Sequence, residues 1–111
     1  GPEVIFSDYE TIPEIAEILN VFVDSLPQML KKMHLAMEGS DLAEIQAQAH
    51  QLKGSGGGYG YPMVTEQARK LETAASNQDP ELVRLHLDKL GNLCAAIERG
   101  WQAKSPTGGQ T

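Results

Sequence analysis

Apolar residues recur at intervals of three and four along most of this chain, and this spacing constrains the fold more than any other sequence feature. It predicts helical segments at residues 11–26, 27–38, 41 to the glycines that begin at 54, 62–76 and 80–103. Thr11 is expected to cap the first segment, with Pro13 in its first turn. A bend or break is expected near Leu26, because Pro27 has no backbone N–H to donate. No run of alternating β-branched residues competes with these helices, so the chain is predicted to be all-α.

The helical segments each carry one apolar stripe, which is expected to face a common core. The predicted core residues are Ile12, Ile15, Leu19, Phe22, Val23, Leu42, Ile45, Ala49, Leu52, Val64, Ala68, Leu71 and Ala75. The connections are short, about three to five residues, which favours antiparallel neighbours. The predicted architecture is an antiparallel up-down-up-down four-helix bundle with a short additional N-terminal helix.

With 111 residues the chain is long enough for one domain and too short for two independent cores. The bundle is assigned to residues 3–103. Residues 104–111 read KSPTGGQT and are expected to form a disordered tail or linker. Residues 1–2, Gly-Pro, resemble the remnant left by tag cleavage.

The formal charge is −6, from 15 acidic and 9 basic side chains, so a nucleic-acid partner would be repelled on average. No stretch approaches the roughly 20 apolar residues that cross a bilayer, and a membrane partner is not expected. Cys94 is the only cysteine, which rules out an internal disulfide and favours a reducing compartment, the cytoplasm. Its apolar neighbours indicate a core residue rather than a nucleophile.

Residues 49–60, with the sequence AHQLKGSGGGYG, carry the most information about function. On a helix, His50 would point about 120° away from the centre of the apolar stripe, and therefore toward solvent. Lys53 and Gly54 would be its neighbours one turn further on. An exposed imidazole is partly uncharged at neutral pH and then carries a nucleophilic nitrogen. His34 and His86 lack such neighbours and are interpreted as ordinary surface or boundary residues.

The glycines at 54, 56, 57 and 58 are costly in a helix, at about 1 kcal/mol each relative to alanine. Two explanations remain open at this stage. The helix ends early, or the missing side chains let the backbone of another protein approach the histidine closely. A phosphate-binding P-loop is excluded, because the lysine precedes the glycines and no strand precedes the loop. Dinucleotide, zinc-protease and di-iron motifs are also absent from the sequence.

The segment resembles the signature of histidine phosphotransfer (Hpt) domains. The residues that carry the resemblance are Ala49, His50, Leu52, Lys53, Gly54, Ser55 and Gly60, with the later pair Leu71 and Glu72. The helical layout extends the resemblance over residues 9–103. The glycine triplet 56–58 departs from the family pattern, as does Ala68, where a cysteine or a larger apolar residue is frequent.

The resemblance implies that His50 accepts a phosphoryl group from the aspartyl phosphate of a receiver domain and passes it to another receiver. Lys53 would stabilise the phosphoryl group, and Gly54 would allow the partner to approach closely. Transfer would be in line to a ring nitrogen, which we expect to be Nε2, with Mg²⁺ held by the receiver and no metal or cofactor on this chain. The expected docking surface comprises Ala43, Gln46, Ala47 and Gly57, together with part of the N-terminal helix.

Expected partners are receiver domains of response regulators and a hybrid sensor kinase, and a monomer is the simplest expectation. No kinase activity with ATP is expected, because the chain has no nucleotide-binding segment. Two alternatives stay open. One is a helical adaptor that binds a receiver without being phosphorylated. The other is the first domain of a chemotaxis-type kinase, whose histidine is phosphorylated from ATP by a separate kinase domain.

Overall fold

The computed structural model describes residues 4–104, and every regular element in that range is a helix. In chain order the elements are the 3-10 helix η1 (Pro13–Ile15), α1 (Ala16–Glu38), α2 (Leu42–Gly56), the 3-10 helix η2 (Gly57–Tyr59), α3 (Pro62–Ser76) and α4 (Pro80–Lys104). The prediction of an all-α chain is confirmed over the described range.

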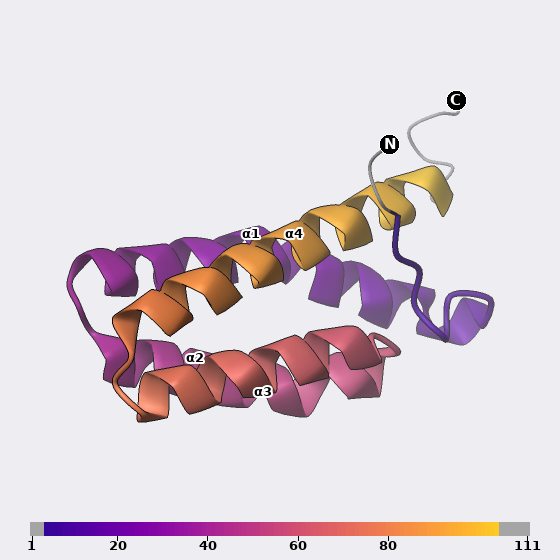
Figure 1. The fold of residues 1–111 in the computed structure, drawn as a ribbon. Helices are drawn as coiled ribbons and strands as arrows, with labels where there is room; N and C mark the ends of the chain where they lie inside the picture. Colours follow the sequence, from indigo (N-terminus) through magenta and orange to yellow (C-terminus); the bar gives the residue numbers. More distant parts are fainter. Residues whose placement is uncertain (1–3, 105–111) are drawn as a thin grey trace.

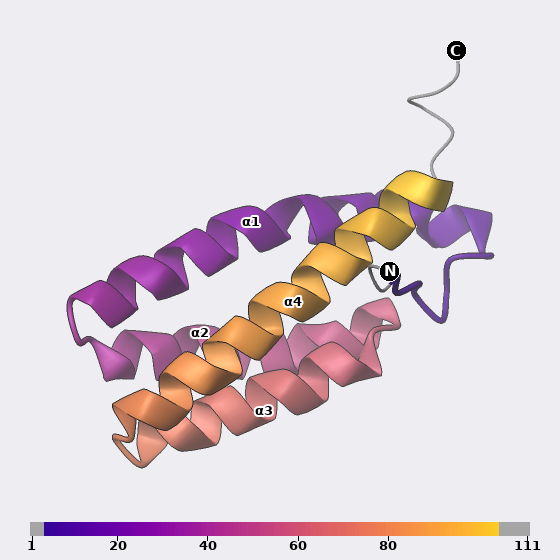
Figure 2. The same ribbon diagram turned by 45° about the horizontal axis from the view of Figure 1, so that its top comes forward.

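The four long helices form a bundle in which the chain turns back at each connection (Figure 1). α1 runs from right to left in that view, α2 returns to the right, α3 runs left, and α4 returns along α1. Figure 2 shows α4 crossing the other helices obliquely, so that its end lies near the start of α1. The most extensive contact between elements is that of α2 with α3. These two helices therefore form the closest pair of the bundle.

The expected break at Pro27 is wrong, because α1 continues through this proline from Ala16 to Glu38. Pro27 lies on the exposed side of the helix, so its ring does not disturb the core. Leu26 and Met33, on either side of it, are fully buried. Burial of such side chains stabilises by about 1.5–3 kcal/mol each, which together offsets the roughly 3 kcal/mol cost of an internal proline.

The expected start of the first helix is also corrected. Thr11 caps neither η1, whose N-cap is Ile12, nor α1, whose N-cap is Ile15. Ile12, predicted to be in the core, is 40% exposed, because it precedes the first helical turn and does not share the stripe of α1. The short additional N-terminal helix is absent from the described residues. The 3-10 turn η1 takes its place and leads directly into α1.

The later helix boundaries follow local capping chemistry. Asp41 Oδ1 accepts a hydrogen bond from Glu44 N at 3.1 Å, which identifies Asp41 as the N-cap of α2. Asp79 caps α4 in the same way, accepting from Leu82 N at 3.2 Å. Helix α3 begins with Pro62 in its first turn, as predicted.

The core is formed by the apolar stripes of all four helices. Of the thirteen residues predicted for it, only Ile12 is exposed, whereas Ile15 and Leu42 are partly buried at its edge. Cys94 is 1% exposed, as expected for a core residue. Within the described range, no helix combines the length and apolar character needed to cross a membrane.

A segment that precedes the helices, residues 4–12, closes one end of the bundle. Ser7 is buried, and its Oγ donates to Tyr59 O at 2.6 Å, while Asp8 N donates to Gly60 O at 2.8 Å. Gly60 has a φ of 83°, and a Cβ there would collide with the Ser7 hydroxyl. At the same end, Trp101 Nε1 donates to Asn20 Oδ1 at 3.1 Å and joins α4 to α1. The segment 4–12 thus holds the turn at Tyr59 and Gly60 that follows α2.

The predicted tail was assigned to residues 104–111, but Lys104 is the last residue of α4. The helix extends this far because Trp101, one turn earlier, is partly buried against α1. The rest of that tail and the Gly-Pro remnant at 1–2 lie outside the described residues.

Helices α3 and α4 are joined by a buried amide. Gln67 is 8% exposed, and its Nε2 lies 3.1 Å from His86 O and 3.0 Å from His86 Nδ1. A carbonyl oxygen only accepts, so this atom is the amide nitrogen and Nδ1 is its second acceptor. His86 is therefore neutral, with its proton on Nε2. Burial lowers the pKa of His86, and the charges of Lys89 and Lys70 lower it further.

This pair predicts a loss of stability in mild acid. Because the pKa of His86 is lower in the folded protein, its contribution is fully present above the pKa of an unfolded histidine and is lost as the pH falls through the folded value. We expect the urea midpoint to fall more steeply below about pH 6.5 in the wild type than in His86→Asn. Asparagine keeps an acceptor near the place of Nδ1 but does not titrate. Parallel pH profiles for the two proteins would contradict this assignment.

Candidate functional site

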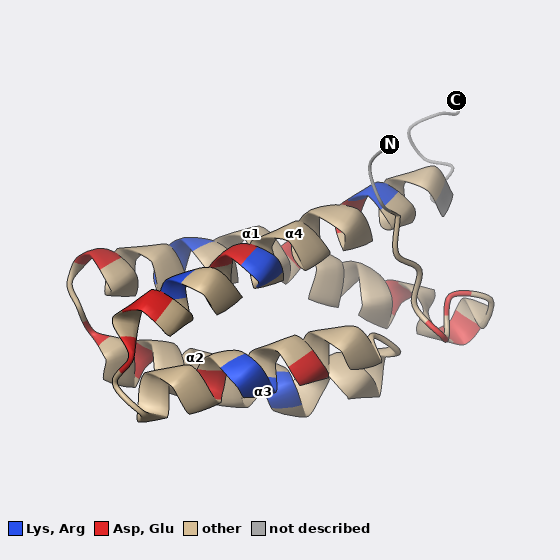
Figure 3. Ribbon diagram, in the orientation of Figure 1, with Lys and Arg blue, Asp and Glu red and all other residues tan. Residues whose placement is uncertain are grey.

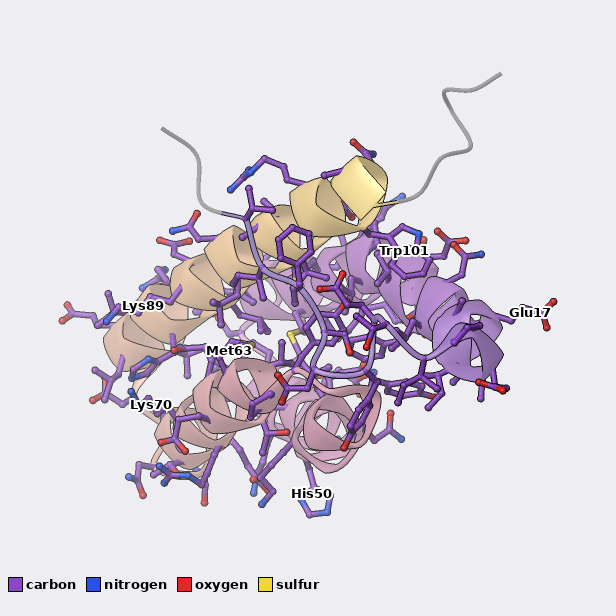
Figure 4. The ribbon with its side chains drawn as sticks, turned by 90° about the vertical axis from the view of Figure 1, so that its right-hand side faces the viewer. Glu17, His50, Met63, Lys70, Lys89 and Trp101 are labelled. Carbon is purple, nitrogen blue, oxygen red and sulfur yellow. The ribbon has the colours of Figure 1, made fainter. Side chains whose placement is uncertain are left out.

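His50 projects into solvent from the middle of α2. Ile45, Ala49 and Leu52 on the same helix are buried, whereas the His50 side chain is 68% exposed. Figure 4 shows its ring extending beyond the surface of the neighbouring side chains, at the outer edge of the bundle. The prediction that His50 faces solvent is confirmed. The ring is accessible to a second protein.

Glu72 of α3 joins His50 to Lys53. Its Oε2 lies 2.8 Å from His50 Nδ1, and its Oε1 lies 2.7 Å from Lys53 Nζ. The Glu72 side chain is 19% exposed and that of Lys53 33%, so these bonds are partly shielded from water. One carboxylate therefore fixes both the histidine and the lysine from the neighbouring helix.

These bonds determine which ring nitrogen of His50 is free. The hydrogen bond from Lys53, and then that from His50, holds the pKa of Glu72 below its ordinary value. The carboxylate is therefore ionised at neutral pH and can only accept, so His50 Nδ1 carries the proton and donates it. In the neutral ring the lone pair is then on Nε2. The exposed imidazole of His50 thus has a defined tautomer with its nucleophilic atom uncovered.

The helix does not end at the first glycine of the glycine-rich segment, as one of the two explanations for these glycines required. α2 continues through Gly54 to Gly56, and η2 follows directly. A Cβ built at Gly54 would meet nothing within 4 Å, whereas one at Gly56 would lie 3.0 Å from Thr65 N, Thr65 Oγ1 and Val64 Cγ1. The explanation that the helix ends early is wrong for these two positions. Gly56 serves packing within the chain, and Gly54 leaves open surface one turn from His50.

The residues predicted to surround His50 are only partly brought together. Ala43, Gln46 and Ala47 line one open hollow with His50, Gln51 and Glu72. Gly57 lies outside this hollow, in η2, where its N–H donates to Thr65 Oγ1 at 2.7 Å. Gly57 is partly buried, and its N–H is directed toward α3 rather than toward the hollow beside His50.

On the other side of α2, a groove separates this helix from α1. Gln51, adjacent to His50, lines both the groove and the hollow. Across the groove, α1 contributes Val21, which is 67% exposed, together with Gln28 and Lys32. The accessible surface around His50 therefore includes part of α1 as well as α2.

The family model described as the Hpt domain matches residues 17–103 of this sequence. The chain belongs to the Hpt domain family. No curated protein and no solved structure matched the sequence in the same comparisons. The matched range includes nearly all of the four long helices and the whole cluster of His50, Lys53 and Glu72.

Hpt domains act in histidine phosphotransfer within two-component signalling, and they interact with receiver domains in phosphorelays. The resemblance inferred from residues 49–60 is thereby confirmed. Glu72 was part of that resemblance but received no role from the sequence. It lies 22 residues beyond His50, and only the packing of α3 on α2 brings it within hydrogen-bond distance.

Along the Hpt helix α3, two basic residues, Arg69 and Lys70, lie between the acidic Glu66 and Glu72 (Figure 3). Arg69 forms an ion pair with Glu66 one turn away. In the described part of the chain, no group of three or more His, Cys, Asp or Glu side chains is placed to hold a metal ion. Burial, and then the charge of Glu98, raises the pKa of Cys94 to about 12, so this thiol is unreactive.

The two helical glycines of the Hpt motif are predicted to respond oppositely to alanine. Gly56→Ala should destabilise by about 1–3 kcal/mol, because the new methyl group would press on the backbone of α3. Gly54→Ala should stabilise by about 0.5–1 kcal/mol, because the site is open and helical. Urea unfolding of both variants measures the difference. Shifts of equal sign would contradict the packing described here.

If Glu72 bridges Lys53 and His50, its titration midpoint should depend on both residues, and more strongly on Lys53. The carboxyl carbon of Glu72, followed by NMR, should titrate below an ordinary glutamate, and Lys53→Met should raise its midpoint more than His50→Ala does. Because the folded pKa is lowered, the stabilisation by this bridge is present above the pKa of an unfolded glutamate and is lost as the pH falls through the folded value. An unchanged midpoint in Lys53→Met would show that the bridge does not form in solution.

Proposed function

We propose that this Hpt domain is a phosphorelay intermediate that accepts a phosphoryl group on His50 from a receiver aspartate and passes it to another receiver. The observation that carries the proposal is the bond between His50 Nδ1 and Glu72 Oε2, at 2.8 Å, on a ring that is otherwise exposed. It leaves the Nε2 lone pair directed away from the carboxylate. A nucleophile with a defined tautomer and an open approach is what this transfer requires.

In the proposed step, the Nε2 lone pair attacks phosphorus in line with the acyl phosphate oxygen. The N–P bond forms, the P–O bond breaks, and the electron pair leaves with the receiver carboxylate. The ring becomes positively charged, with its proton still on Nδ1. The Glu72 carboxylate accepts a hydrogen bond from this proton and stabilises the developing charge. Transfer to a second receiver is the reverse of the same step.

Lys53 and Gly54 have complementary roles in the proposal. Lys53 Nζ is held by Glu72 one turn from His50, where it can shift to an oxygen of the arriving phosphoryl group. Gly54 presents backbone without a side chain on exposed surface next to this lysine. A receiver backbone can therefore approach there without meeting a Cβ.

Docking is proposed to involve the surface on both sides of His50. The hollow formed by Ala43, Gln46 and Ala47 presents short side chains, and the groove toward α1 adds the exposed Val21. Gly57 is not part of this proposed surface, because its N–H is directed to α3.

The receiver is proposed to supply Mg²⁺ and the acidic pocket, so that the Hpt domain contributes the nucleophile and its charge partners. A hybrid sensor kinase is a further proposed partner. The domain is proposed to act as a monomer, because the apolar stripes of its helices are buried against one another. A cytoplasmic location is proposed from the single cysteine, which is free and buried.

The proposal predicts an acid-labile label on one histidine. Incubation with a phosphorylated receiver should label the wild-type protein and His34→Gln, whereas His50→Gln should stay at background. His34 is an exposed histidine of α1 and is therefore a matched control. ATP alone should give no label.

Equal labelling of His50→Gln and wild type would contradict the assignment of the acceptor. Absence of label on the wild type, with binding of the receiver retained, would favour the adaptor instead. Label that appears only with a separate kinase domain and ATP would favour the chemotaxis-type alternative.

A further inference from the structure

The hydroxyl of Thr65 is inserted into the backbone ladder at the end of α2. In a continuing α-helix, Gly57 N–H would donate to Lys53 O. Here Gly57 N–H donates to Thr65 Oγ1 at 2.7 Å, and Thr65 Oγ1 donates to Lys53 O at 3.0 Å. The Thr65 hydroxyl thus replaces one intrahelical hydrogen bond with two bonds to a side chain of α3. This replacement occurs where α2 ends, at Gly56.

Thr65 and Glu72 lie on the same face of α3, seven residues or about two turns apart. Both contact α2 through Lys53. Thr65 holds the backbone carbonyl of this lysine, and Glu72 holds its ammonium group together with His50 Nδ1. These two polar links, about two helical turns apart on α3, specify the register of α2 along α3 in addition to the apolar packing between the two helices.

The close approach that lets Thr65 reach α2 depends on Gly56. A Cβ at this glycine would lie only 3.0 Å from Thr65 N and Oγ1. Without that Cβ, the backbones come near enough for a short hydroxyl side chain to bond to both a carbonyl and an N–H. Thr65 is itself partly buried, so water competes weakly for these bonds. The hydrogen bonds of Thr65 to α2 therefore require a glycine at position 56.

We propose that Thr65 is a positioning residue for the phosphoacceptor, acting through α2 and Glu72 rather than by contact with the phosphoryl group. Its hydroxyl sets the register of α2 on α3. That register keeps Glu72 within hydrogen-bond distance of His50 Nδ1 and so keeps the Nε2 lone pair free. The inference rests on the proposed phosphotransfer and deepens it.

The test compares Thr65→Val, which keeps the shape but removes the hydroxyl, with Thr65→Ser, which keeps the hydroxyl. Thr73→Val, an exposed position of the same helix, is the matched control. The first readout is the ¹⁵N NMR spectrum of the His50 ring, which reports the tautomer without any phosphotransfer. We expect Thr65→Val to populate both tautomers, and Thr65→Ser and Thr73→Val to retain the wild-type spectrum.

The second readout is the rate of transfer from a phosphorylated receiver. A small misplacement of a reacting group lowers rates strongly, and we expect a loss of about tenfold in Thr65→Val and less than about twofold in Thr65→Ser and Thr73→Val. A folded Thr65→Val with the wild-type tautomer and rate would overturn the proposal. If Thr65→Val does not fold, Thr65→Ala is measured instead, and an unchanged tautomer there overturns it equally.

The two readouts separate this inference from the proposed function. If the wild type accepts no phosphoryl group, the proposed function fails, while the nitrogen spectra still decide whether Thr65 controls the His50 tautomer. If the wild type is labelled and Thr65→Val is unaffected in both readouts, only the positioning role fails.

Discussion

The close packing of α3 against α2 is the interaction on which the site around His50 depends. The two backbones approach closely at Gly56, where a Cβ would lie only 3.0 Å from Thr65 N. This proximity brings Glu72 to His50 and Thr65 to the last turn of α2. The bundle therefore does more than expose a histidine. It supplies, from a neighbouring helix, the groups that determine the state of the ring.

The charges at the site are balanced in a way that suits a reversible transfer. Before transfer, Glu72 accepts from both His50 and Lys53, and neither the carboxylate nor the ammonium lacks a partner. In the proposed transfer the ring gains positive charge next to the same carboxylate, and the lysine shifts toward the phosphoryl oxygens. Because these groups are partly exposed, water lowers the energetic difference between the two arrangements. The proposed step can then run in either direction.

Much of the fold was predictable from local pattern. The 3-to-4 spacing identified the helices and about half of the buried core, because burial of an apolar stripe dominates helix stability in a bundle. The core residues predicted from this spacing included none of the buried stripe of α4, which comprises Val83, Leu87, Leu90 and Ile97. Pro27 shows where local rules failed. The cost of a proline inside a helix can be read from the sequence. The compensating burial of Leu26 and Met33 depends on how the whole of α1 packs against the other helices. Thr11 failed as a cap for a related reason, since residues 4–12 pack against the end of the bundle and delay the helix.

By itself, the sequence determined that the chain is helical, that it belongs with histidine phosphotransfer domains, and that His50 faces solvent with Lys53 one turn away. The orientation of His50 and the place of Lys53 follow from spacing within a single helix, which has a fixed geometry, whereas the family follows from the resemblance of the motif. Only the tertiary structure decided which nitrogen of His50 is free and why a glycine stands at 56. Both depend on contacts between α2 and α3, and the register of two packed helices is set by side chains that are distant in sequence.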